Sequence, residues 1–517
     1  MMERADSGQK LFTRMRLWEF PEQYVVEPTD GSSGSFLSIS RNDGSMKLTD
    51  DLPECSSVRV PKIRNIYGVI GMLKLIAGSY LIVITGRECV GSYMGHPIFK
   101  ATSLKILHCN HALKNSPAEQ KKVETEFSEL LNVAEHTPGL YFSYDTNLTL
   151  SSQRLHELGD ESKLLPLWRQ LDPYLLPVIQ GNILSIRGSI PFTWEQIVDL
   201  TYKPKFEIVK PEEAPRIAER HFLDLRKTYR SILAVDLVNK HGGEGRLSEK
   251  FSNAMQRVSS DDVRYVHFDF HHICGHVHFE LLSILYEQIE DFLEKKGYLL
   301  LNERGEKLKE QLGVVRANCI DCLDRTNVTQ SMIARKVLEW QLRRMGVFAA
   351  EETINMHPNF DDNFKILWAN HGDDISIQYS GTPALKGDFV RYGQRTAQGM
   401  LNDFKNALMR YYLNNFVDGT KQDAIDLLQG HYIVSVSRDL TAPSQQGGLE
   451  AVASFPVALS VVMAGLFLAY VSLRQGPLSF QRVLFSLLCA GMSVGIVFFV
   501  KVNGRVFCNR PRLHKPR

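Results

Sequence analysis

The chain has 517 residues, of which 44% are hydrophobic, and its formal net charge at pH 7 is +2. This near balance of charge excludes a strongly basic nucleic-acid-binding protein, while the apolar content is sufficient for large cores in two to four domains. Residues 1–20 mix acidic and basic side chains without an apolar run, which excludes a secretory signal peptide. The eight cysteines lack the spacing of a disulfide framework, so the sequence predicts a reducing compartment.

Residues 1–183 carry the pattern of antiparallel strands. β-branched and aromatic residues, separated by Gly and Asn, predict strands over residues 70–76 and 80–85. A helix is predicted over residues 121–131 from its apolar periodicity. We therefore expect a strand-rich N-terminal subdomain.

Residues 184–434 alternate strand and helix patterns. Residues 231–238 and 264–270 read as strands, and residues 281–296 read as a helix. This alternation predicts a second domain of the α/β class, with helices flanking the sheet.

A group of histidines in the second domain invites interpretation as a metal site. Their spacing is not that of a zinc ligand set, so we expect a polar loop and no bound metal. The four residues are His271, His272, His276 and His278.

Residues 319–327, which read C-I-D-C-L-D-R-T-N, are the most informative part of the chain. Residues 313–315 before them read as a short buried strand. The residues after them carry a helical pattern, with Thr326 or Asn327 near the predicted N-cap and Gly346 as the predicted end. A strand, a tight loop and a helix start direct successive backbone N–H groups and the helix dipole at one anion. The sequence predicts a phosphate-binding loop.

The residue types in this loop suit phosphate-ester hydrolysis through a thiol. Positive surroundings would lower the pKa of Cys319 from ~8.5, so we expect this residue to be the nucleophile. Arg325 would hold two phosphoryl oxygens and stabilise the transition state. Asp324, or else Asp321, would protonate the leaving alkoxide. The expected course is a phosphocysteine intermediate and its hydrolysis by water, with no metal or cofactor.

Further residues of the loop and three basic residues within residues 384–395 are predicted to contact the substrate. The basic residues could form an ordinary solvated surface or bind headgroups at an anionic membrane surface. The predicted substrate-binding residues are Asn318, Cys322, Leu323, Thr326, Asn327, Lys386, Arg391 and Arg395.

Other interpretations of the loop remain open. Cys319 and Cys322 form a C-x-x-C pair, which is also typical of a dithiol redox centre or of half a zinc site. No second C-x-x-C completes a zinc site in the sequence, and a redox centre requires neither Arg325 nor the paired acids. Two cysteines that merely pack in a core are a further alternative.

Two long apolar runs occupy residues 451–473 and 483–500. At ~1.5 Å per residue each run is long enough to cross, or nearly cross, a hydrocarbon layer of ~30 Å. We expect a transmembrane hairpin within residues 451–517, joined to the catalytic part by a flexible tether over residues 435–450. The alternative is a pair of core helices in a soluble protein.

The charges that flank these runs predict their orientation. The loop between them contains Arg474 and Arg482, whereas the tail is more basic and has no acidic residue. The positive-inside rule therefore places the tail in the cytosol, and two spans place the large N-terminal part there as well. The basic tail residues are Lys501, Arg505, Arg510, Arg512, Lys515 and Arg517.

Residues 316–327 read R-A-N-C-I-D-C-L-D-R-T-N and resemble the signature R-x-N-C-x-D-C-L-D-R-T-N of the Sac-domain phosphoinositide phosphatases. Residues 80–85, 187–191, 268–270 and 414–419 extend the resemblance over nearly the whole chain. It points to the membrane-anchored branch of the family that has a single Sac domain.

The resemblance implies a fold, an activity and a location. The fold is an N-terminal β-rich Sac subdomain followed by a cysteine-phosphatase-like α/β catalytic domain. The activity is removal of an inositol-ring phosphate from a phosphoinositide lipid, commonly phosphatidylinositol 4-phosphate. The location is the membrane of the endoplasmic reticulum or the Golgi apparatus. Nothing in the sequence names a protein partner.

The chain departs from the family pattern at residues 182–186, where the family usually carries several dozen more residues, including an acidic stretch. This shortening could remove part of the active-site wall. A second function therefore stays open, that of a catalytically impaired phosphoinositide-binding or scaffold protein.

Overall fold

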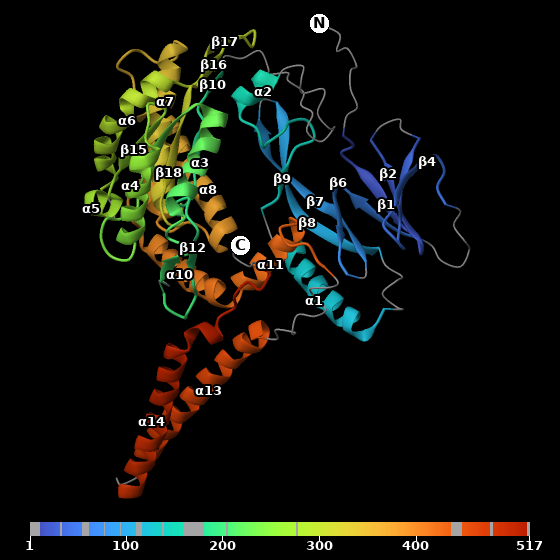
Figure 1. Ribbon diagram of the computed structural model, residues 1–517, viewed down its shortest axis with the longest axis vertical. Helices are drawn as coiled ribbons and strands as arrows, with labels where there is room; N and C mark the ends of the chain where they lie inside the picture. The colour runs from blue at the N-terminus through green and yellow to red at the C-terminus, as the bar shows by residue number, and fades with distance from the viewer. Residues whose placement is uncertain are drawn as a thin grey trace.

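The computed structural model describes most of the chain and shows a body from which a long helical hairpin projects (Figure 1). The described residues are 11–30, 34–53, 61–76, 78–93, 95–109, 116–136, 139–158, 180–202, 205–275, 278–435, 447–475 and 479–513.

Two antiparallel sheets form the N-terminal part. The first sheet has the order β4-β3-β2-β1-β5, with β1 (Met15–Glu19), β2 (Gln23–Pro28), β3 (Phe36–Ser40), β4 (Met46–Thr49) and β5 (Lys62–Ile66). The second has the order β6-β7-β8-β9, with β6 (Gly68–Lys74), β7 (Ser79–Tyr93), β8 (His96–Cys109) and β9 (Tyr141–Phe142). Apolar side chains from both sheets, among them Leu17, Ile39 and Leu81, share one core. The predicted strands over residues 70–76 and 80–85 correspond to β6 and the first part of β7.

A helix connects this part to the rest of the body. Helix α1 (Ala118–Glu135) packs with Phe127 and Leu131 against Tyr80 of the second sheet, and the same core includes Leu427 of α11 (Asp418–Leu428). Helix α2 (Ser152–Leu158) follows.

A parallel sheet with the order β11-β18-β14-β15 forms the centre of the second part. Its strands are β11 (Ser185–Arg187), β14 (Ser231–Asp236), β15 (Val263–His267) and β18 (Gly313–Asn318). Every residue of β14 and β18 is buried, as expected for strands that are covered on both faces. Along β14, Leu233 and Val235 face one core, and Ile232 and Ala234 face the other.

Helices cover both faces of this sheet and confirm the predicted α/β class (Figure 1). Helices α3 (Ala214–Tyr229) and α4 (Gly245–Val258) pack on one face, and α6 (Leu282–Lys296) and α7 (Asp324–Arg344) pack on the other. Helices α8 (Pro358–Ser380), α9 (Gly387–Tyr392) and α10 (Ala397–Phe416) follow in the chain. The loop predicted around the histidines is wrong in part, because His271 and His272 lie in the short helix α5 (Phe270–Cys274).

The short join at residues 182–186 leads directly into the central sheet. Strand β10 (Gln180–Asn182) pairs with β16 (Leu299–Leu301), which also pairs with β17 (Lys307–Lys309). Strand β11 begins after residues 183 and 184 and pairs with β18. The shortened segment therefore leaves β18 with a neighbouring strand on each side. A separate ribbon pairs β12 (Trp194–Gln196) with β13 (Phe206–Ile208).

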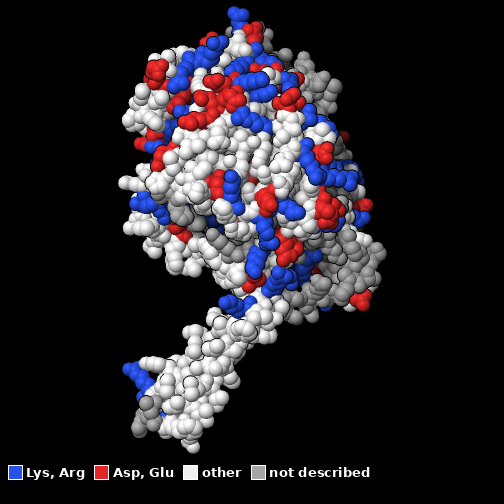
Figure 2. Space-filling view, turned by 60° about the vertical axis from the view of Figure 1, so that its left-hand side comes forward, with Lys and Arg blue, Asp and Glu red and all other residues white. Residues whose placement is uncertain are grey.

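The C-terminal hairpin consists of α13 (Gly447–Arg474) and α14 (Phe480–Val502). Segments Phe455–Arg474 and Phe480–Val502 are long and apolar enough to cross a membrane, with mean hydropathies of 2.1 and 2.5. Only 11% and 17% of the residues in their most apolar windows are buried, and the hairpin forms an uncharged stalk along most of its length (Figure 2). The helices approach closely where the Ser486 hydroxyl donates to Ala469 O at 3.0 Å.

Candidate active site

Each strand of the parallel sheet ends in a polar residue at the same edge. These residues are Arg187 of β11, Asp236 of β14, His267 of β15 and Asn318 of β18. The carboxyl ends of parallel strands are the usual place for a ligand site in such sheets. Residues 319–323 connect β18 to α7 at this edge, so the predicted phosphate loop lies there.

Cys319 lies at the base of the loop with its side chain completely buried. Its Sγ accepts the backbone N–H of Cys322 at 2.9 Å and the hydroxyl of Thr326 at 3.4 Å. Cys322 has a left-handed φ of 56°, which costs a non-glycine residue roughly 1–2 kcal/mol. The tight turn brings this N–H back onto the sulfur.

The start of α7 differs from the prediction. The helix begins at Asp324, with Leu323 at the N-cap, so Thr326 and Asn327 lie within its first turn. Thr326 is fully buried and its hydroxyl donates to Cys319 Sγ, so its observed role is to hold the sulfur. The Asn327 side chain donates to Trp368 O at 2.9 Å and thereby ties α7 to α8.

Arg187 ties the loop to the edge strand. Its Nη2 donates to the carbonyl of Cys322 and, at 3.0 Å, to that of Leu323, and its Nη1 donates to Asn327 Oδ1 at 3.4 Å. One planar guanidinium therefore holds two successive carbonyls of the loop outward.

A buried polar network supports the loop from below. The Asn318 amide donates to Asp236 Oδ1 at 2.7 Å and accepts from Arg316 at 3.1 Å. Asn318 and Asp236 are both fully buried, and burial raises the pKa of Asp236. Asn318 thus fixes the end of β18 inside the protein, and its contact with a substrate stays a prediction.

Arg316 has a neutral partner on its other side. Its Nε donates to His221 Nε2 at 3.1 Å. Burial, followed by the charge of Arg316, lowers the pKa of His221 to about 4, so this imidazole is uncharged at neutral pH and can accept the bond.

Arg325 is directed at a carboxylate. Its Nη1 and Nη2 donate to the two carboxylate oxygens of Glu244 at 2.9 and 3.2 Å, and Nη1 also donates to Leu237 O at 3.1 Å. Burial opposes ionisation of Glu244, but the hydrogen bonds from Arg325 outweigh it and lower the pKa of Glu244. A phosphoryl group that binds Arg325 must therefore compete with Glu244.

The expected low pKa of Cys319 is not found. Burial raises the pKa of the Cys319 thiol well above its ordinary value, and its interaction with Cys322 and the nearby Asp321 carboxylate act in the same direction. The hydrogen bond with Cys319 lowers the pKa of Cys322 to about 7. The expectation is not met because burial, Cys322 and Asp321 together outweigh the charge of Arg325, which acts to lower the pKa of Cys319.

Two acids of the loop face the open side of the site. Asp321 accepts the N–H of Leu323 at 3.3 Å and lies 3.4 Å from Cys319 Sγ, whereas Asp324 stands at the start of α7. Desolvation by the surrounding protein, followed by the charge of Asp321, raises the pKa of Asp324 to about 6, although its side chain remains in contact with solvent. Asp324 therefore has the pKa of a proton donor near neutral pH.

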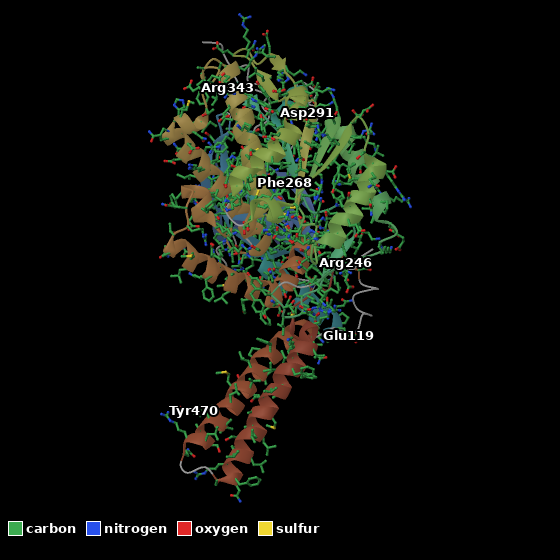
Figure 3. All side chains as sticks on the ribbon, turned by 90° about the vertical axis from the view of Figure 1, so that its left-hand side faces the viewer. Glu119, Arg246, Phe268, Asp291, Arg343 and Tyr470 are labelled. Carbon is green, nitrogen blue, oxygen red and sulfur yellow. The ribbon has the colours of Figure 1, made fainter. Side chains whose placement is uncertain are left out.

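The loop opens into a cavity of about 3480 Å³. Asp321, Leu323, Asp324 and Arg325 line it, together with Lys386 and Arg410, whose charges oppose the rise in the pKa of Asp324. Figure 3 shows that Glu119 and Arg246, which also line this cavity, lie at the end of the body from which the hairpin projects.

Two of the three downstream basic residues are engaged elsewhere. Arg391 pairs with Asp373, and Arg395 pairs with Asp388 and, at 2.7 Å, with Asp403. Both arginines hold α8, α9 and α10 together, and their predicted contact with a headgroup stays a prediction. Lys386 lines the cavity, and its contact with the substrate stays a prediction.

Among the residues that the structure describes, no three His, Cys, Asp or Glu side chains gather as a metal site would require. His278 pairs with Glu280 at 2.9 Å, and His272 donates its backbone N–H to Asp269. His276 lies outside the described residues.

Sequence reasoning missed four residues of the site, namely Arg187, Asp236, Glu244 and Arg410. The sequence carried a signal for two of them. Asp236 is a lone carboxylate in a predicted buried strand, and Glu244 stands in a Gly-Gly-Glu-Gly run soon after it. Arg410 is distant in sequence and carried no comparable signal.

The fold and the loop define an α/β protein in which a strand, a loop and a helix bring a cysteine and an arginine together at the carboxyl edge of a parallel sheet. The family model described as SacI homology domain matches residues 67–184 and 182–275. Phosphoinositide phosphatases SAC7 and SAC6 of Arabidopsis thaliana are each 62% identical to this chain, SAC7 over 100% of both chains, and SAC6 over 99% of this chain and 100% of its own. Phosphatidylinositol-3-phosphatase SAC1-A of Danio rerio is 30% identical over 97% of this chain and 98% of its own.

The chain belongs to the Sac-domain family of phosphoinositide phosphatases, which are phosphoric monoester hydrolases.

The family match also bears on the short join at residues 182–186. Its two segments meet at residues 182–184, and the alignment with SAC7 spans 596 positions, 79 more than the 517 residues of this chain. The relative therefore carries positions that have no counterpart here.

We expect Arg187→Lys to weaken binding of inorganic phosphate about tenfold, on the scale of one or two lost hydrogen bonds. Lysine keeps the charge but lacks the planar fork that holds the carbonyls of Cys322 and Leu323. Isothermal titration with phosphate measures the change. Arg226→Lys, at an exposed ion pair with Asp262, is the matched control. Equal affinities for the two variants would show that Arg187 does not shape the loop.

Proposed function

We propose that this protein hydrolyses an inositol-ring phosphate of a membrane phosphoinositide through a cysteinyl-phosphate intermediate on Cys319. The observation that carries the proposal is the site at the end of β18. There a buried sulfur accepts a loop N–H at 2.9 Å, and Arg325 and Asp324 line the cavity into which the loop opens. A thiol, a guanidinium and a carboxyl group are the groups that metal-free transfer of a phosphoryl group requires.

The proposed reaction begins when the ring phosphate enters the loop and draws Arg325 away from Glu244. Cys319 Sγ, as the thiolate, attacks phosphorus, and the bond from phosphorus to the ring oxygen breaks. Asp324 gives its proton to that oxygen, which leaves as the inositol hydroxyl. Water then attacks the phosphocysteine, Asp324 takes up a proton from it, and inorganic phosphate and the Cys319 thiolate are released.

The first candidate substrate is phosphatidylinositol 4-phosphate, which the resemblance to the family implies. The Danio rerio relative is named for the 3-phosphate. Lys386 and Arg410 in the cavity provide positive charge for the anionic headgroup but do not distinguish one ring position from another. Phosphate release from the two monophosphate isomers, measured side by side, assigns the preference.

The hairpin supports anchoring in a membrane. Large apolar side chains such as Phe467 and Phe498 are 65% and 67% exposed, which is costly in water and favourable in lipid. We infer that α13 and α14 span the bilayer with the catalytic part on the cytosolic side, in the endoplasmic reticulum or the Golgi apparatus as the resemblance implies.

Two alternatives have a specific observation in their favour. A catalytically impaired lipid-binding protein is favoured by the shortened join and by the engagement of Arg325 with Glu244. A dithiol redox protein is favoured by the proximity of Cys319 and Cys322 and by the lowered pKa of Cys322. A change in reactive thiols under mild oxidant that requires Cys322 would support the redox function.

Cys319→Ser should lower the rate of phosphate release from phosphatidylinositol 4-phosphate on the order of 10³-fold or more, because the nucleophile is lost. Colorimetric phosphate detection with purified full-length protein measures the rate. Cys274→Ser alters another buried cysteine of the same core and should leave the rate nearly unchanged. Retention of a near-native rate by Cys319→Ser would rule out the cysteinyl-phosphate mechanism.

The pH dependence should identify the proton donor. A donor must be protonated, so kcat/KM should fall as the pH rises past the value of about 6 to which the pKa of Asp324 is raised. Asp324→Asn should remove this decline and lower the maximum rate by about 10²–10⁴. Asp321→Asn should move the decline to lower pH, because the charge of Asp321 raises the pKa of Asp324. An unchanged profile for Asp324→Asn would assign the donor elsewhere.

Protease added outside sealed microsomes should digest the N-terminal and catalytic parts, because two spans leave both of them on the cytosolic face. Immunodetection of an epitope near the N-terminus follows the cleavage. A lumenal marker protein reports that the vesicles are intact. Protection of the epitope in intact vesicles would reverse the inferred orientation.

A further inference from the structure

The segment that follows α14 folds back onto the catalytic part. It comprises η6 (Gly504–Phe507) and residues 508–513, and we refer to it as the return segment. It lies across the junction of α10 and α11. This junction includes residues 414–419, which resemble the family sequence but have no part in the proposed reaction. Asn415 and Thr420 at this junction, and Asp423 in α11, provide its hydrogen bonds.

Asn509 is the centre of this contact and is 4% exposed. Its backbone N–H donates to Asn415 O at 2.7 Å. Its side-chain oxygen accepts the backbone N–H of Thr420 at 2.7 Å, and its amide donates to the Thr420 hydroxyl at 2.8 Å. The first N–H groups of a helix lack partners within the helix, and Val417 at the N-cap of α11 provides no side-chain bond. Asn509 therefore caps α11 from a distant part of the chain.

Asp423 holds the end of the return segment. Its carboxylate accepts the backbone N–H of Arg512 at 2.8 Å and that of Leu513 at 2.9 Å. Leu513 packs against the core that joins α1, the second N-terminal sheet and α11. The return segment thus reaches the contact between the two parts of the body.

Two glycines show how closely the surfaces fit. A Cβ at Gly419 would lie 2.2 Å from Asn509 Oδ1 and 2.5 Å from the carbonyl carbon of Arg510. A Cβ at Gly504 would lie 2.0 Å from Asp199 O. Both sides of the contact therefore require the absence of a side chain.

Aromatic rings join the hairpin to the body at the same place. Phe455 of α13 lies 5.1 Å from Phe416 of α10 and 6.4 Å from Phe507, measured between ring centroids. Phe499 of α14 lies 6.4 Å from Phe507. At its near end α13 thus packs against α10, and both helices of the hairpin pack against the return segment.

We propose that the return segment is a second anchor, which fixes the cavity at the surface of the membrane that holds the hairpin and so restricts the enzyme to phosphoinositides of that same membrane. A catalytic part joined to the hairpin only through α13 could rotate relative to the bilayer. Attachment at both α13 and the return segment would keep the face that carries the cavity toward the bilayer. From Val502 to Asn509 the chain advances seven residues, which reach at most about 25 Å. Residues 508–513 line the cavity that also contains Arg325. The inference rests on the proposed function for its substrate.

The test uses full-length protein in phosphatidylcholine vesicles and the variant Asn509→Ala. Phosphatidylinositol 4-phosphate is placed either in the same vesicles or in protein-free acceptor vesicles, and a water-soluble short-chain form of the lipid is assayed in parallel. Asn503→Ala is the matched control, because the Asn503 amide donates to Phe499 O within its own helix turn. Hydrogen exchange of the Thr420 amide reports on the contact without reference to activity.

We expect the wild-type protein to hydrolyse lipid in its own vesicles and to leave acceptor vesicles nearly untouched. Asn509→Ala should lower the ratio of same-vesicle rate to soluble-substrate rate about fivefold, on the scale of a lost hydrogen-bond pair, and should speed exchange of the Thr420 amide. Asn503→Ala should change neither quantity.

Three outcomes would overturn the second anchor: unchanged Thr420 exchange in Asn509→Ala, an unchanged ratio despite faster exchange, or an equal loss of soluble-substrate and same-vesicle rates. Failure of the proposed function is distinguishable from these outcomes. A wild-type protein that releases no phosphate from the soluble substrate would contradict the proposed function, while Thr420 exchange would still report whether Asn509 holds the return segment.

Discussion

The hydrogen bond between Asn318 and Asp236 is the constraint around which the site is built. The two residues are directly paired at the ends of adjacent parallel strands, and neither is exposed. A buried amide and carboxylate that lost each other would both be left without a partner, so the ends of β14 and β18 are fixed to one another. Cys319 follows immediately, Arg187 holds two carbonyls of the loop, and Glu244 holds Arg325. The strained backbone of Cys322 is tolerated because these surroundings hold it.

Much of this arrangement is visible in the sequence because it depends on short-range patterns. The apolar run over residues 232–235 marks β14, and α6 follows its apolar period to within one residue of the predicted range. The strand, loop and helix around Cys319 could be predicted because one short motif contains all of them. The apolar hairpin could be predicted for the same reason, since its signal lies in consecutive residues.

The remainder depends on contacts between distant segments. Arg325 appears in the sequence as a free phosphate ligand, yet it pairs with Glu244, which lies 81 positions away. Arg391 and Arg395 appear as a basic surface, yet carboxylates of α8, α9 and α10 surround them. A pattern gives the charge of a side chain but not its partner. The high pKa of the Cys319 thiol has the same origin, because burial and a neighbouring acid depend on the folded environment.

Helix α11 has a consequence for how this protein can be divided. It contacts α1 of the N-terminal part, and it is capped by Asn509 from beyond the hairpin. A chain shortened before the hairpin would keep Cys319, Arg325 and Asp324 yet lose that cap and leave the Asp423 carboxylate without its two N–H donors. The part of the chain that carries the loop is thus continuous in space but not in sequence, and its last structural residues are encoded after the apolar hairpin.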